Sequence, residues 1–116
     1  MTLSGIEAVL KGVCERTYHL AAPKNCEPDY IVWHEYGARG VRGDDRAQLR
    51  VWRIQIDAYS QRDDAAEGFF REIMEALDDA DVSYAVVDIG FDEEALCLRC
   101  IIQCEDASAR LVMMGG

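Results

Sequence analysis

Two cysteines near the C-terminal end, Cys97 and Cys100, have the spacing that most suggests chemistry. A Cys-x-x-Cys pair is typical of zinc sites and of thiol redox centres. A tetrahedral zinc site would need a second pair of ligands, yet the only two histidines, His19 and His34, both lie in the first third of the chain. We therefore expect no zinc site here.

The segment around these cysteines has the alternation of a β-strand. Residues three apart in a strand point to opposite faces, whereas Cys100 and Cys104 share a face with Leu98 and Ile102. In that position a cysteine serves as a small core hydrophobe. The chain has five cysteines, an odd count, and its N-terminus does not have the form of an export signal. These features predict reduced thiols in a cytoplasm and no disulfide framework.

Other catalytic arrangements lack essential parts. A cysteine–histidine nucleophile would also need an orienting group and an oxyanion donor, and the sequence marks neither. The acidic runs 78–81 and 92–94 lack the spacing of an EF-hand loop. The glycines at 37, 40 and 43 have no phosphate-binding lysine and no helix after them. We predict no catalytic, cofactor-binding or metal-binding residues, and therefore no enzyme.

Arginines gather around these glycines. The segment 37–46 holds three glycines and three arginines with little to bury, which predicts an exposed, mobile loop. One interpretation is an ordinary solvated hairpin loop. The other is a loop that reaches a partner, either the acidic surface of a neighbouring copy or passing nucleic acid. On that interpretation the candidate contact residues are Arg39, Arg42, Arg46 and Arg50.

The net charge of -10 is segregated along the chain. Residues 1–60 hold eight acidic and eight basic side chains, so residues 61–116 hold the other fourteen acids (22 minus 8) and only four bases (12 minus 8). This distribution excludes a protein that binds nucleic acid over its whole surface, because such binding needs clustered Lys and Arg. It fits head-to-tail packing between copies, and equally an acidic surface that keeps the protein in solution.

The length of 116 residues and the hydrophobic pattern predict one α+β domain over residues 1–116. No apolar run is long enough to cross a membrane. We expect the order α-β-β-α-β-β, with a four-stranded, mostly antiparallel sheet and two helices packed on one face. The expected segments are a helix at 3–16, a proline-bearing connector at 21–29, strands at 30–36, 52–58, 84–91 and 95–104, a helix at 63–79 and a flexible tail at 106–116.

Several of these segments resemble the tail-completion and tail-terminator proteins of long-tailed bacteriophages and prophages, which join head to tail. Residues 29–33 follow the connector as in that family. Residues 54–60 have its strand pattern of hydrophobic, Gln, hydrophobic, Asp, small, aromatic and Ser, and lead into the helix 64–77. The closing hairpin 84–104 also matches in position. The resemblance spans nearly the whole chain.

The resemblance implies a small α+β protein without catalytic residues or cofactors. Copies would form a ring, commonly a hexamer, at the head-proximal end of the tail tube. That ring would stop tube growth and join the capsid connector, with tail-tube and connector proteins as partners and DNA only passing through. The protein would act in the host bacterial cytoplasm during assembly and then in the virion tail. Alternatives are another head-tail connector or minor tail subunit, and a small cytoplasmic binding or regulatory module.

Overall fold

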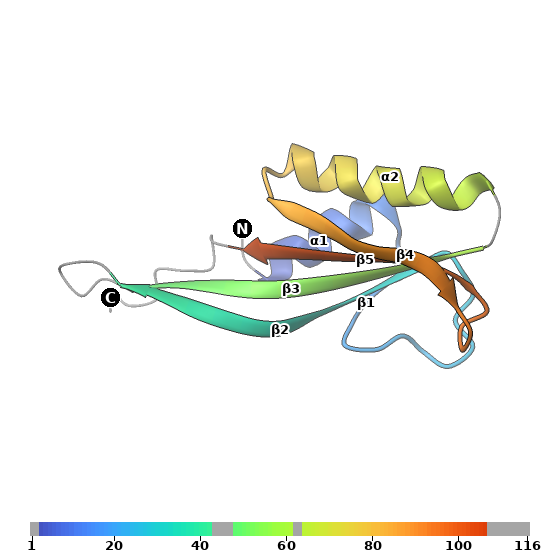
Figure 1. Ribbon diagram of the computed structural model, residues 1–116, viewed down its shortest axis with the longest axis horizontal. Coiled ribbons are helices and arrows are strands. Elements are labelled where there is room, and N and C mark those ends of the chain that lie inside the picture. Colours follow the sequence, from blue (N-terminus) through green and yellow to red (C-terminus); the bar gives the residue numbers. More distant parts are fainter. Residues whose placement is uncertain (1–2, 43–47, 62–63, 107–116) are drawn as a thin grey trace.

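Five strands form one sheet, in the order β1-β2-β3-β5-β4, in the computed structural model, which describes residues 3–42, 48–61 and 64–106. Two helices lie together on one face of this sheet (Figure 1). The elements follow one another along the chain as α1 (Leu3–Val13), β1 (Thr17–His19), β2 (Tyr30–Arg42), β3 (Gln48–Ser60), α2 (Asp64–Asp79), β4 (Tyr84–Asp92) and β5 (Cys97–Asp106). The α+β class is confirmed. None of the helices in the described ranges is long and apolar enough to span a membrane.

The predicted four-stranded sheet in the order α-β-β-α-β-β is wrong, because β1 adds a fifth strand. β1 pairs parallel with β2, with Thr17 opposite Ile31 and His19 opposite Trp33, while every other pairing in the sheet is antiparallel. Three residues are too few to show a period of two. The strand forms because the connector brings the chain back beside it, and the sequence alone does not show that return.

The predicted mobile loop at 37–46 is also wrong over its first six residues. β2 continues through this segment to Arg42 and pairs with β3 as far as Gln48. The glycines at 37 and 40 are poor strand formers, but pairing with β3 supplies the hydrogen bonds that hold them extended. Residues 43–47 lie outside the described residues, as do residues 107–116 of the predicted tail, which follows Asp106 at the end of β5.

The core lies between the helices and the sheet, with the central strand β3 in its middle. Ile54, Ile56 and Ala58 of β3 are fully buried on the helix-covered face. α2 turns Phe70 and Ile73 into the same core, as its 3.6-residue stripe predicts. The other strands and α1 complete this core with Ile6, Leu10, Ile31, Trp33, Cys100, Ile102 and Cys104.

Within the described residues, the opposite face of the sheet carries no helix (Figure 1). The alternation of β3 predicts this one-sided packing, because Arg53, Gln55 and Asp57 alternate with its buried residues. We call this uncovered surface the open sheet face. It spans the long β2–β3 hairpin, which extends beyond β1, β4 and β5 towards one end of the molecule (Figure 1).

A hydrogen bond from a buried serine ties the end of the connector to β3. Ser60 is almost fully buried, and its Oγ donates to Oδ1 of Asp29 over 2.6 Å. A hydroxyl that donates to a carboxylate makes one of the stronger kinds of hydrogen bond. This contact fixes the start of β2 beside the end of β3, where Tyr30 lies opposite Tyr59.

Replacing Ser60 with alanine should lower the free energy of unfolding by about 1–2 kcal/mol, because the Asp29 carboxylate loses a buried donor. Urea denaturation, monitored by tryptophan fluorescence, would measure the loss of unfolding free energy. Gln61→Ala, at the exposed neighbouring position, is the control and should change stability by less than about 0.5 kcal/mol. Equal losses in the two variants would contradict the assigned role of this hydrogen bond.

Candidate functional site

The cysteines that suggested chemistry lie inside the protein. Cys97, Cys100 and Cys104 are buried, and all five cysteines are free thiols. Cys100 and Cys104 belong to the core together with Ile102, as the strand alternation predicts. Within residues 3–42, 48–61 and 64–106, no group of three or more His, Cys, Asp or Glu side chains is arranged to hold a metal ion.

Burial also makes these thiols poor nucleophiles. It raises the pKa of Cys100 to about 11, with a further contribution from the Asp57 carboxylate. It raises the pKa of Cys97 as well, and there the nearby Asp92 acts in the same direction. The thiolate is the reactive form of cysteine, so both side chains are protonated and unreactive at neutral pH.

The structure brings most of the predicted contact arginines together in one hairpin. In the register of β2 and β3, Arg39 lies opposite Val51, Arg42 opposite Gln48, and Arg50 opposite Gly40. Their backbones therefore share the extended end of the hairpin seen in Figure 1. Arg46 lies outside the described residues.

A row of polar side chains crosses the open sheet face on three strands. Tyr36 Oη of β2 donates to Oε1 of Gln103 on β5 over 3.5 Å. Gln103 Nε2 donates to Oε1 of Gln55 on β3 over 3.1 Å, and Gln55 Nε2 donates to Oδ1 of Asp57 over 3.0 Å. Each amide is held by its neighbour, so this part of the face has a fixed pattern of donors and acceptors.

Aromatic rings and an arginine continue the open sheet face towards the β4–β5 turn. Tyr30 and Tyr59 stack with their ring centroids 4.6 Å apart, and burial raises the pKa of Tyr30 to about 12. Arg99 lies opposite Tyr59, and its Nη1 is 3.1 Å from Oδ2 of Asp92. Tyrosine and arginine held in fixed positions are the side chains that most often dominate protein–protein contacts. The arrangement is suited to binding a protein surface.

A second polar contact stabilises the fold. His19 of β1 stacks on Trp33 of β2 with the ring centroids 4.1 Å apart, and its Nε2 contacts Oε1 of Glu35. The hydrogen bond with His19 holds the pKa of Glu35 below its ordinary value. Both contacts fasten the short strand β1 to β2, which gives this histidine a structural role.

A known protein family matches most of the chain. The family model described as tail completion protein gp17 matches residues 1–96. The chain belongs to this family. The match runs from α1 to the end of the β4–β5 turn, and so includes the long hairpin and the strands β2, β3 and β4. No curated protein matches the chain.

Membership of a phage tail completion family confirms the resemblance found in the sequence and implies a role in tail assembly.

The sequence pattern predicts the arginine cluster but not the polar row of the open sheet face. The alternation of β3 marked Gln55 and Asp57 as an uncovered face. The contact of Gln55 with Gln103 depends on the pairing of β3 with β5, and these two residues are 48 positions apart in the chain, so no local pattern reveals that register.

Thiol labelling should separate the five cysteines into two classes. We expect Cys14 and Cys26, which are partly exposed, to react with a disulfide reagent at pH 7–8, while Cys97, Cys100 and Cys104 react only after unfolding. Cys14 should be the slower of the first two, because burial raises its pKa. Ellman's reagent measures the number of reactive thiols in the folded protein and, with guanidinium added, in the unfolded protein. Rapid labelling of all five in the folded protein would contradict the buried placement.

Proposed function

We propose that this protein caps the tail tube of a long-tailed phage or prophage and provides the surface that joins the tail to the capsid connector. Copies of the chain act together as a ring, commonly a hexamer in this family. The protein works by shape and surface chemistry, without catalysis and without a cofactor. Its place is the host bacterial cytoplasm during assembly and the virion tail afterwards.

The observation that carries this proposal is the open sheet face in a member of a tail completion family. A sheet covered on one side only presents a broad and nearly rigid surface, and the polar row of Gln55, Asp57 and Gln103 gives it a specific pattern. The stacked pair Tyr30 and Tyr59 adds aromatic area. Such a surface suits stacking against a flat neighbouring ring.

The charge distribution supports a ring of copies packed head to tail. The hairpin carries Arg39, Arg42, Arg46, Arg50 and Arg53, whereas the whole excess of -10 belongs to residues 61–116. Complementary charge on two parts of a subunit sets the orientation of packing. The hairpin then reaches the tube, the connector or the acidic part of the next copy. An acidic lumen would let DNA pass without adhering, because like charges repel.

Two other functions give different results in simple observations. A head-tail connector or minor tail subunit would leave the tails normal in length when it is removed. A cytoplasmic binding or regulatory module would have its gene among metabolic genes. A gene placed between those of the capsid connector and the major tail-tube protein would support the proposal most.

Deletion of the gene from the phage or prophage that encodes this protein tests the function. Complementation of that deletion with the variant Arg39→Ala/Arg42→Ala/Arg46→Ala tests the hairpin. Without the protein, we expect DNA-filled heads and separate tails of abnormal length in electron micrographs. Tails of normal length that fail to join heads would point to joining alone. The triple variant should restore fewer than a tenth of the virions, because it removes the charges that reach the partner.

The control for the triple variant is Lys11→Ala/Lys24→Ala, which removes exposed positive charges outside the hairpin and should restore virions like the wild type. Circular dichroism and the urea midpoint should be unchanged in both variants. Full restoration of virions by the triple variant would reject the hairpin as the contact.

A further inference from the structure

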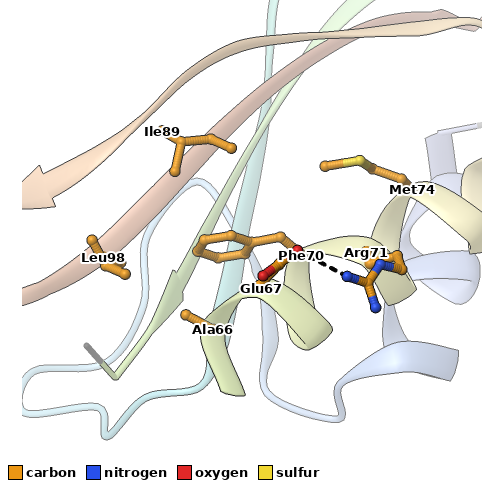
Figure 2. Close-up of a pocket in the computed structure, with 7 residues that line it drawn as sticks. All are labelled: Ala66, Glu67, Phe70, Arg71, Met74, Ile89 and Leu98. Atoms are coloured by element: carbon orange, nitrogen blue, oxygen red, sulfur yellow. Dashed lines mark hydrogen bonds and ion pairs between the residues drawn. The ribbon is translucent and has the colours of Figure 1, made fainter. Parts of the chain in front are cut away.

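An apolar groove lies between α2 and the strands β4 and β5, on the helix-covered side of the sheet (Figure 2). Ala66, Phe70 and Met74 of α2 form one wall, and Ile89 of β4 and Leu98 of β5 form the other. Figure 2 shows the Phe70 ring pointing from α2 towards Ile89 and Leu98. The groove has a volume of about 440 Å³, within the range of roughly 300–1,000 Å³ that binding sites for compact ligands occupy.

The strand beside this groove is apolar and exposed. β4 is an edge strand that pairs only with β5, and Val86, Val87, Ile89 and Phe91 each leave between 39% and 54% of their surface accessible. Isolated exposed apolar side chains are common on protein surfaces, but a group of them along one strand is typical of an interaction site.

We propose that this groove receives the C-terminal segment of a second copy of the chain, through the apolar residues Leu111, Val112, Met113 and Met114. These residues are the only run of four apolar side chains among the ten residues that follow β5. Methionine is flexible and fills irregular apolar gaps well. The inference rests on the proposed ring, for which it supplies a subunit contact.

The reach of the chain keeps its own Leu111 and Val112 away from the Leu98 end of the groove, so a segment that places these two residues there comes from a second copy. Leu98, at the groove, and Asp106, at the end of β5, are eight strand residues apart, a distance of about 27 Å. The five residues from Asp106 to Leu111 span at most about 18 Å, even when fully extended. A turn back towards the groove would shorten that reach further. Leu111 and Val112 of the same chain therefore cannot lie in the groove beside Leu98.

Charge also favours this occupant. The exposed side chains of α2 in the described range include five acids, Glu67, Glu72, Glu75, Asp78 and Asp79, and one base, Arg71. Arg71 Nη2 lies 2.9 Å from Oε1 of Glu67 at the rim of the groove, so its charge is already paired (Figure 2). The segment 107–116 contains one charged residue, Arg110, and no acid. A strongly acidic helix beside an apolar groove fits a segment with one arginine followed by apolar residues.

A labelled peptide with the sequence of residues 106–116 tests the groove directly. Titrated with the full-length protein, its fluorescence anisotropy should rise to saturation, and Ile89→Asp should weaken binding at least tenfold. Ile89 is 54% exposed, so the variant is expected to fold, which circular dichroism would check. Leu20→Asp is the control: Leu20 is 68% exposed and follows β1 at the opposite edge of the sheet, so this variant should bind as the wild type does.

Sedimentation of mixed variants tests whether the tail binds in a second copy. Ile89→Asp and Leu111→Asp/Met113→Asp should each be monomeric at concentrations where the wild type associates. An equimolar mixture should form pairs, because one partner supplies an intact groove and the other an intact tail. Wild-type association by the tail variant, peptide binding unaffected by Ile89→Asp, or a monomeric mixture would overturn the inference.

The outcome is separable from that of the proposed function. Peptide binding and pairing are measured on purified protein, whereas tail capping is measured by electron microscopy of a deletion strain. Loss of groove binding with an intact tail-assembly role would reject the contact alone. Pairing through the groove in a protein whose deletion leaves virion assembly unaffected would reject the proposed function and keep the contact.

Discussion

The packing of β3 against the helices is the constraint on which the rest of this structure depends. β3 is the central strand of the sheet, and its buried residues Ile54, Ile56 and Ala58 alternate with polar ones. Because side chains in a strand alternate between faces, both helices must cover the same side to bury this set. A register slip of one residue would expose all three, so the strand fixes both the layer arrangement and the orientation of its neighbours.

One-sided packing also decides where interactions with other molecules are possible. The face that the helices leave open carries the row of Gln55, Gln103 and Asp57, whose hydrogen bonds cross from β5 to β3. These amides are held by each other, so the face keeps a single arrangement without a covering layer. On the helix-covered side, the edge strand β4 keeps exposed apolar side chains, and a groove lies between β4, β5 and α2. The arginine hairpin projects from the same body (Figure 1).

The fold disfavours the thiol chemistry that the spacing of Cys97 and Cys100 suggests. Cys97 and Cys100 have the spacing of a ligand pair, but burial in and beside the core raises the pKa of both thiols and keeps them protonated. Burial favours the neutral form because a thiolate loses its hydration there. The side chains left on the surface are suited to contacts with proteins, in agreement with membership of a tail completion family.

The sequence by itself determined the α+β class, α2, the alternation of β3 and the family, because each of these depends on a local period or on a short run of residue types. It could not determine β1, the extension of β2 to Arg42, or the contact of Gln103 with Gln55. Those features depend on hydrogen bonds between strands that are distant in the chain. A glycine-rich segment such as 37–42 has weak strand preference and becomes a strand only when β3 supplies a partner. Tertiary structure therefore decided which surfaces the protein presents.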